Sequence, residues 1–229
     1  MRCAIIQPNY LPWKGYFDII NDVDVFVFLD DVQYTKNDWR NRNRIKTSKG
    51  TEWITVPVLG GIHQKIFETP IDYSKKWEKK HKNTLHANYA ASEYYESYSS
   101  DIYEIYSKKY DSISQLSICT IKKICQLLEI DTKFLYSSDL DTKGKKEDKV
   151  IEICSMIGAN EYISGPTAKN YIHNEKFENA GIDLYYKDYS YPEYPQLWGE
   201  FNPFVSIVDT LFNCGDKAQF YIWGWRYGA

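Results

Sequence analysis

The chain has 229 residues, 43% of them hydrophobic, which is enough for one large domain or for a domain with a helical appendage. The formal net charge of -3 argues against a general polyanion-binding role, and five cysteines without a CxxC pair argue against a disulfide framework or a zinc site. No apolar run approaches the roughly 18 residues of a membrane helix, and no signal peptide precedes the first strand, so we expect a cytoplasmic protein with no membrane partner.

The beginning of the chain predicts two buried strands joined by a loop and a short helix. Ile5-Ile6 and residues 24–29 are short, β-rich and bounded by turn residues, and residues 15–21 between them suit a helix. Such a unit is normally right-handed with parallel strands, and ligands bind beyond the carboxyl ends of the strands. The loops at residues 7–15 and 30–44 are therefore the first places to look for a site.

The middle of the chain predicts helices. Trp77, His81, Leu85 and Tyr89 share one helical face at four-residue spacing, and residues 113–128 carry a second apolar stripe. Further strands are expected at residues 52–58, 133–136, 161–163 and 182–189, and further helices at 147–157, after Thr167 and at 204–212. Because strands alternate with helices, we predict an α/β fold with a mostly parallel sheet of about five strands. Residues 1–229 form one domain in this interpretation, with a helical subdomain or insertion at 74–130.

The loop after the first strand is aromatic and rigid. Two prolines fix φ in the run QPNYLPWKGYF at residues 7–17, and Gly15 allows close backbone approach at a helix start, where free N–H groups suit phosphate. Tyr and Trp suit stacking on a sugar or a base. Candidate substrate-binding residues in this loop are Gln7, Pro8, Tyr10, Trp13, Gly15 and Tyr16. A hydrophobic plug over the sheet is the alternative interpretation, and Lys14 is of the type expected at the surface.

The second loop combines two carboxylates with a run of cations. Asp30 and Asp31 stand at a strand end and are candidate bases. Alternate residues of an extended segment face the same way, so Arg40, Arg42 and Arg44 can converge on a diphosphate with bidentate geometry. The candidate substrate-binding residues here are Tyr34, Lys36, Trp39, Arg40, Arg42, Asn43 and Arg44. A solvated basic loop is the alternative, and an RNA-binding arm is disfavoured because the rest of the chain shows no supporting basic surface.

A third loop follows the strand at 161–163. Its candidate substrate-binding residues are Ser164, Gly165, Thr167, Lys169 and Tyr171, since hydroxyls and N–H groups at a helix start hold anions. His63 follows two glycines in a loop and is the third catalytic candidate, whereas His81 shares a helical face with Trp77 and is either a satisfied semi-buried histidine or a substrate contact. Because no metal spacing, catalytic triad or phosphate-binding glycine motif occurs, we expect neither a metal nor a tightly bound cofactor.

The run at residues 7–17 resembles the opening signature of the WbqC-like family, and residues 30–44, 77–89, 163–171 and 204–215 also fit its pattern. The resemblance covers nearly the whole chain and implies a role in bacterial surface polysaccharide biosynthesis, in O-antigen (lipopolysaccharide) or capsule clusters. We therefore expect a transferase that acts on a nucleotide-linked sugar, for instance by N-acylating an amino sugar with an amino acid or small acid. Its partners would be the nucleotide sugar and an activated acyl donor of unknown kind, with no DNA, and with tRNA only if the donor is an aminoacyl-tRNA.

A more distant likeness is to nucleotidyltransferases of the HIGH superfamily, and it implies a Rossmann-like sheet. Trp13-Lys14-Gly15-Tyr16 stands where that superfamily has His-x-Gly-His, and Ile163-Ser164-Gly165 through Lys169 resembles its later Ile-Ser loop. Both histidines are replaced, by Trp13 and Tyr16, which carry no cation. A HIGH-type nucleotidyltransferase or ATP-dependent ligase, and a non-catalytic nucleotide-sugar binding protein, therefore remain as alternatives to the transferase.

Overall fold

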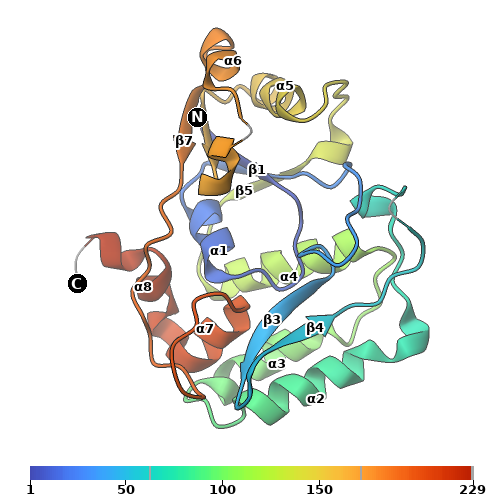
Figure 1. Ribbon diagram of the computed structural model, residues 1–229, viewed down its shortest axis with the longest axis vertical. Coiled ribbons are helices and arrows are strands. Elements are labelled where there is room, and N and C mark those ends of the chain that lie inside the picture. Colours follow the sequence, from blue (N-terminus) through green and yellow to red (C-terminus); the bar gives the residue numbers. More distant parts are fainter. Residues whose placement is uncertain (62, 171, 228–229) are drawn as a thin grey trace.

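Five parallel strands form the central sheet in the order β5-β2-β1-β6-β7 (Figure 1). The computed structural model describes residues 1–61, 63–170 and 172–227. The strands are β1 (Arg2–Ile6), β2 (Val25–Phe28), β5 (Lys133–Tyr136), β6 (Glu161–Ser164) and β7 (Asp183–Tyr186). The chain winds outward from β1 in both directions, through β2 to β5 and through β6 to β7. This confirms the predicted α/β fold, which is Rossmann-like, and places the topological switch point between β1 and β6.

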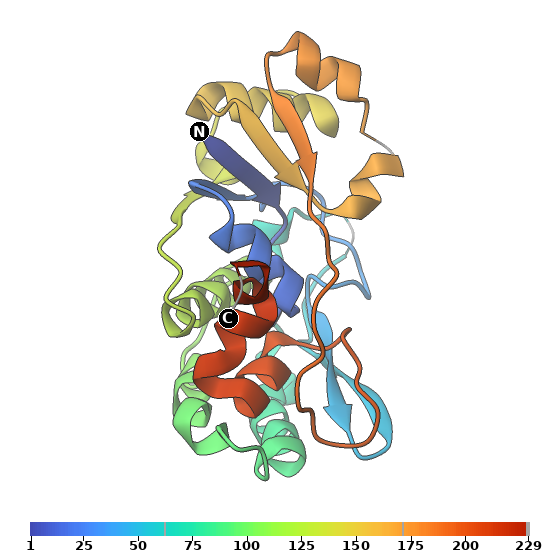
Figure 2. The same cartoon turned by 90° about the vertical axis from the view of Figure 1, so that its left-hand side faces the viewer.

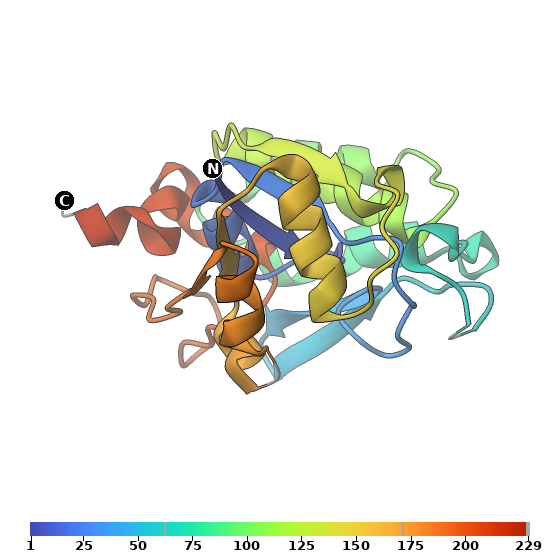
Figure 3. The same cartoon turned by 90° about the horizontal axis from the view of Figure 1, so that it is seen from above.

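The sheet is buried on both faces, as parallel sheets are. Alternation along β1 and β2 sends Ala4, Phe26 and Phe28 to one side, and Cys3 and Val27 to the other. The second side packs against α5 (Glu147–Ile157) and α6 (Asn174–Asn179), which lie nearest the viewer in Figure 3. The first side packs against α1 (Lys14–Asn21) and α4 (Ile113–Leu127).

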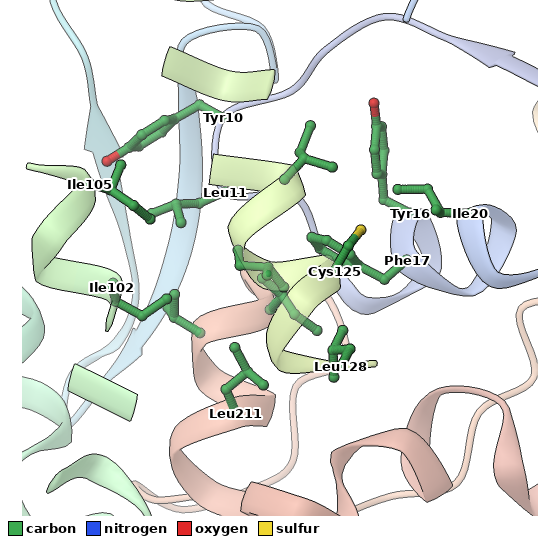
Figure 4. Packing of buried hydrophobic residues seen from close by; sticks show 14 of the residues in the cluster. Tyr10, Leu11, Tyr16, Phe17, Ile20, Ile102, Ile105, Cys125, Leu128 and Leu211 are labelled. Carbon is green, nitrogen blue, oxygen red and sulfur yellow. The ribbon is translucent and has the colours of Figure 1, made fainter. Parts of the chain in front are cut away.

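The remaining helices lie beyond α1 and α4. They are α2 (Trp77–Tyr89), α3 (Tyr95–Ile105), α7 (Ile207–Cys214) and α8 (Ala218–Ile222). Figure 4 shows how the loop after β1 joins this core, with Tyr10 and Leu11 lying among side chains from α3, α4 and α7. Residues 74–130 thus contain three α-helices, and the face with Trp77, His81, Leu85 and Tyr89 is buried. None of the helices in the described ranges is long and apolar enough to cross a membrane.

Two predicted elements differ in the structure. The strand expected at 52–58 is β4 (Gly50–Thr55), which pairs antiparallel with β3 (Arg42–Thr47) in a separate hairpin and not with the central sheet. Only two residues join β3 to β4, and a connection that short permits antiparallel pairing alone. The helix expected after Thr167 is a 3-10 helix, Pro166–Asn170, in which the Ala168 N–H bonds to the Gly165 carbonyl three residues back.

A long segment without regular secondary structure connects β7 to α7. Figure 2 shows it running from the orange strand β7, past α1, to the hairpin β3–β4 and the red helix α7. The segment comprises residues 187–206 and brings Tyr189, Tyr191 and Phe204 against Trp13, at ring-centroid distances of 4.8, 5.8 and 6.4 Å. It therefore supplies one side of the region around the first loop.

Candidate functional site

A cavity of about 190 Å³ lies beside the loop that follows β1. Aromatic rings form much of its wall, and the polar groups are two amides and one guanidinium. The lining residues are Asn9, Pro12, Trp13, Trp39, Asn43, Arg44 and Phe204. The structure thus brings together four residues that the sequence singled out in two separate loops, Trp13 in the first and Trp39, Asn43 and Arg44 in the second.

Backbone hydrogen bonds hold the walls of the cavity together. Tyr10 N–H donates to the Trp39 carbonyl at 2.9 Å, and Ser206 N–H donates to the Arg44 carbonyl at 2.8 Å. The Asn43 side-chain amide donates to the Leu11 carbonyl at 2.7 Å, and Leu11 has a φ of 43°, which is unusual for a leucine. A conformation of this kind persists only where its surroundings enforce it, so the loop is held in shape before any ligand arrives.

Arg44 lies in the cavity as a cation without a counterion. In the described part of the chain its guanidinium makes neither a hydrogen bond nor an ion pair, and its buried Nε has no partner. The guanidinium carbon lies 5.8 Å from the centre of the Trp39 ring and 5.5 Å from that of Trp53. Aromatic rings stabilise a guanidinium less than a carboxylate partner does. An anion that enters the cavity can therefore still form a favourable ion pair with Arg44.

The three arginines of the second loop do not converge on one point. Arg42 and Arg44 alternate along β3 and share a face, as predicted, but Arg40 lies in the preceding turn. Arg40 donates to Asn9 Oδ1 and pairs with Asp38 at 3.2 Å, and burial lowers its pKa. Arg42 donates to the Asn37 carbonyl. The predicted common diphosphate clamp is therefore wrong in its geometry, because a turn breaks the extended run between Arg40 and Arg42.

Arg40 has a buried tyrosine near it. Tyr34 is 2% exposed, and its hydroxyl has no hydrogen-bond partner among the described residues. Burial raises the pKa of Tyr34 and Asp38 adds to this, while Arg40 and Arg42 oppose it, so both arginines are within electrostatic range of the hydroxyl. Lys36, in the same loop, is exposed.

Gly15 has a different role from the predicted one. A Cβ built on Gly15 would lie 2.4 Å from the Trp13 indole, so the ring occupies the space that we expected to admit a phosphate. Trp13 in turn contacts Tyr189, whose hydroxyl lies 3.2 Å from the position of a Cβ on Gly165. Tyr189 therefore connects the third loop to Trp13 in the cavity wall. In that loop Ser164 is buried, Thr167 and Lys169 are exposed, none of the three lines the cavity, and Tyr171 lies outside the described residues.

Several predicted contact residues support the loop from inside the protein. The Tyr10 hydroxyl bonds to His81 Nδ1 at 2.8 Å and to the Tyr106 hydroxyl at 2.7 Å. His81 Nε2 bonds to the Thr55 carbonyl at 3.1 Å, and burial lowers the pKa of His81 to about 4, so the ring is neutral at pH 7. The Tyr16 hydroxyl donates to the Gln7 carbonyl at 3.1 Å, and Pro8 is buried. These residues fix the position of the cavity without lining it.

The predicted bases lie outside the cavity as well. Asp30 accepts hydrogen bonds from Ser138 N–H and Oγ, both at 3.0 Å, and burial raises its pKa. Asp31 pairs with Lys149 at 2.6 Å and accepts from Ser137; burial raises its pKa, but these bonds outweigh it and leave the pKa lowered. This cluster joins the ends of β2 and β5 to α5. His63 is exposed, and the next residue, Gln64, receives the Tyr34 N–H on its carbonyl at 2.8 Å.

Lys14 is the main residue that the sequence interpretation missed. It is 2% exposed, although we expected a surface lysine. Its ammonium lies 4.8, 4.9 and 5.6 Å from the ring centres of Tyr191, Tyr194 and Phe201, and it donates to the Pro192 carbonyl at 3.3 Å. All four partners belong to the segment 187–206. Burial lowers the pKa of Lys14 to about 8.

Two further buried groups hold the same segment against the hairpin and α7. The Lys46 ammonium donates to Gln196 Oε1 at 2.7 Å and to the Glu200 carbonyl. Asp209 accepts from the hydroxyls of Tyr89 and Tyr194, each at 2.8 Å, and from Gln196, and burial raises its pKa. Phe204, which the sequence did not suggest as a site residue, is placed in the cavity wall by these long-range contacts.

A second hollow, of about 300 Å³, lies between α1, β7 and the C-terminal helices. Its charged groups neutralise one another, since Asp18 pairs with Lys187 and Arg226, and Asp22 pairs with Lys187 and Arg2. The cavity at Arg44 is the better candidate site because its cation has no such partner. Among the described residues, no group of three His, Cys, Asp or Glu side chains is arranged to bind a metal ion.

The fold and the cavity define a Rossmann-like α/β protein with an aromatic, cationic cavity beside the loop that follows β1. The chain belongs to the WbqC-like protein family, which matches residues 7–221. It is similar to the uncharacterized protein Rv1507c of Mycobacterium tuberculosis, with 44% identity over 225 residues, covering 96% of this chain and 97% of that protein. No solved structure matches the chain significantly, so the likeness to HIGH nucleotidyltransferases stays a prediction.

Proposed function

We propose that the cavity binds part of a nucleotide-linked sugar, and that the protein is a cytoplasmic transferase acting on that sugar in surface polysaccharide biosynthesis. The observation that carries the proposal is the unpaired guanidinium of Arg44 in a cavity walled by Trp13, Trp39 and Phe204. A ligand that satisfies such a site carries a ring and an adjoining anion. Nucleotide sugars have both, since a base and a sugar flank a diphosphate.

The size of the cavity indicates how much of the ligand it takes. Complete ligand pockets commonly measure about 300–1,000 Å³, and this cavity measures about 190 Å³. It therefore suits one ring and its nearest phosphate, with the rest of the ligand lying outside the cavity. Asn9 also lines the cavity, and although its Oδ1 accepts from Arg40, its Nδ2 can donate a hydrogen bond that selects among rings.

N-acylation of an amino sugar is the reaction that we favour, because the family resemblance implies the pathway. The amine would attack the carbonyl carbon of an activated acyl donor, a C–N bond would form, and the donor's leaving group would depart with the electron pair of the broken bond. A base must take the amine proton. Asp30 and Asp31 already bind serine and lysine partners. His63 is the better candidate for the base, because it is exposed and because the next residue, Gln64, is bonded to Tyr34 of the second loop.

The two alternatives make different use of the same site. An ATP-dependent enzyme of the HIGH type is favoured by Ser164 and Lys169, but Trp13 and Tyr16 fill the places of the two histidines, and the Tyr16 hydroxyl is directed to the Gln7 carbonyl. A non-catalytic nucleotide-sugar binding protein is favoured by the occupied state of Asp30 and Asp31. Turnover experiments separate both from the acyltransferase.

Arg44→Ala tests the proposal directly. Isothermal titration calorimetry with a panel of nucleotide sugars, ATP and coenzyme A should show binding of at least one nucleotide sugar to the native protein. Loss of a charge-assisted hydrogen bond costs about 1.5–3 kcal/mol, so Arg44→Ala should bind it about 10- to 100-fold more weakly. Lys108→Ala is the matched control, since Lys108 is an exposed cation just after the end of α3 and is paired with Glu104. Equal affinities for the two variants would show that Arg44 does not hold the anion, and consumption of ATP in turnover mixtures analysed by mass spectrometry would select the HIGH-type alternative.

A further inference from the structure

Two indoles and two guanidiniums lie close together on the outer face of the hairpin β3–β4 and the turn that precedes it. Trp39 and Trp53 are 39% and 41% exposed, and their ring centres lie 5.3 Å apart. Arg42 lies 4.2 Å from the centre of the Trp53 ring, and the buried Nε atoms of Arg42 and Arg44 have no partner. We name this set, Trp39, Arg42, Arg44 and Trp53, the aromatic–arginine face. Large exposed rings beside cations are unusual on a surface that has nothing to bind.

A groove lined by lysines lies on the other side of the hairpin, and it is reached from this face across the edge of β4, which pairs with β3 alone among the described strands. It lies between β4 and α2, has a volume of about 510 Å³, and is lined by Glu52 and by seven residues from 76 to 88. Because side chains alternate along a strand, Glu52 shares a face with its cross-strand partner Ile45, and Trp53 shares the opposite face with Arg44. Lys76, Lys79 and Lys80 are among the lining residues, and none of the three forms an ion pair with a described residue. Glu52 is the single acidic residue of the lining. We name this feature the lysine groove (α2 and the hairpin are seen in Figure 1).

We propose that the aromatic–arginine face and the lysine groove together bind a single-stranded polynucleotide. Sequence-tolerant binding of single strands requires rings on which bases stack and cations that follow the phosphates. Trp53 and Trp39 supply the rings, while Arg42 and the three lysines supply the cations. The sequence alone disfavoured an RNA-binding arm at residues 30–44 because the rest of the chain showed no supporting basic surface. The fold places such a surface beside β4, so a bound strand would cross the edge of β4 to reach both sets of cations.

An acidic peptide is the other polyanion that such lysines could attract. It would leave the exposed indoles without a planar partner, whereas a base stacks on an indole and its phosphate reaches an adjacent cation. The position of the surface also matters, since Trp39 and Arg44 belong to the aromatic–arginine face and line the cavity. A strand bound on this face would therefore lie beside the cavity. The corollary that the acyl donor is attached to the end of an RNA rests on the proposed function; the binding itself does not.

Charge reversal in the lysine groove tests the proposal. The variant is Lys76→Glu with Lys79→Glu and Lys80→Glu, and the matched control is Lys143→Glu with Lys145→Glu and Lys146→Glu, three exposed lysines in the connector before α5. Because each substitution removes two units of charge, both triple variants change the net charge from -3 to -9. Fluorescence anisotropy with labelled 12-nucleotide RNA and DNA strands, in 50–300 mM salt, measures the affinity of each. Trp53→Ala, outside the cavity lining, tests the stacking part.

The groove variant should bind about 100-fold more weakly than the control at 0.1 M salt. The slope of its plot of log affinity against log salt should also be smaller in magnitude by about two, because each of the three lost phosphate contacts on a single strand removes about 0.7 from the slope. Trp53→Ala should lose about 10-fold. Unequal affinity for the RNA and DNA strands assigns the source of the strand. Equal weakening in groove and control variants, competition by poly-glutamate at equal charge, or no binding of either strand at 50 mM salt would each overturn the proposal. The groove variant should still bind the nucleotide sugar. Failure of polynucleotide binding in this experiment is therefore distinguishable from failure of nucleotide-sugar binding, which Arg44→Ala tests.

Discussion

Replacement of Lys14 by methionine should stabilise the protein. Lys14 is 2% exposed, and three rings and one carbonyl surround its ammonium. Burial is the main cause of the lowering of its pKa from 10.5 to about 8, and Cys214, Asp209 and Asp18 partly oppose it. One pKa unit corresponds to about 1.4 kcal/mol, so the charged amine costs the folded state about 3 kcal/mol at pH 7.

Methionine fills a similar volume without the charge, but it also forfeits the attraction of the ammonium to the rings. That attraction offsets about 1–2 kcal/mol for a desolvated cation, which leaves a net gain of about 1–2 kcal/mol for Lys14→Met. In a chain of 229 residues this raises the melting temperature by about 2–8 °C. Lys49→Met, at an exposed lysine of the hairpin turn, is the control and should change it little.

The advantage of the variant should depend on pH in one direction. The folded pKa of Lys14 is below its unfolded value of 10.5, so between about pH 8 and pH 10.5 the unfolded chain binds more protons and the native protein becomes more stable as pH rises. The difference between Lys14→Met and native protein, measured by scanning calorimetry at pH 7, 8 and 9.5, should therefore shrink toward alkaline pH. A variant that melts below the native protein at pH 7 would show that the buried ammonium is a net stabilising contact, and the reasoning from desolvation would fail.

Two other predictions concern the cavity wall and the buried carboxylates. Trp13 lines the cavity and is only partly buried, so Trp13→Ala should weaken nucleotide-sugar binding at least 10-fold in calorimetric titrations; a loss of stability of about 3–5 kcal/mol with affinity unchanged would instead identify a core plug. Asp31→Asn removes the carboxylate that Lys149 pairs with, and should cost about 2–3 kcal/mol in urea unfolding at pH 7. Because the pKa of Asp31 is lowered in the folded protein, its contribution to the free energy of unfolding is present above the ordinary carboxyl pKa and disappears as pH falls. The stabilities of variant and native protein should therefore become similar at acid pH. If Asp31→Asn had normal stability but no turnover, Asp31 would be the catalytic base.

Elements with a local signal were predictable from the sequence. The helix at Glu147–Ile157 ends at Gly158, which has a φ of 74°, and the strand at Lys133–Tyr136 lies at the predicted residues. Each is defined by periodicity and turn chemistry within about ten residues of chain. The positions of the candidate loops were predictable as well, because the carboxyl ends of parallel strands share one edge of a sheet.

The character of individual side chains in those loops came only from the tertiary structure. Arg40 and Arg44 are four residues apart with similar neighbours in sequence, yet one pairs with Asp38 and the other is left unpaired in a cavity. Lys14 is buried by Tyr191, Tyr194 and Phe201, which follow it by more than 170 residues. The lysine groove exists because α2 packs beside β4. The burial of a side chain and the partners of its charge depend on contacts between segments that are distant in the sequence. No local pattern in the sequence shows which of these segments come into contact.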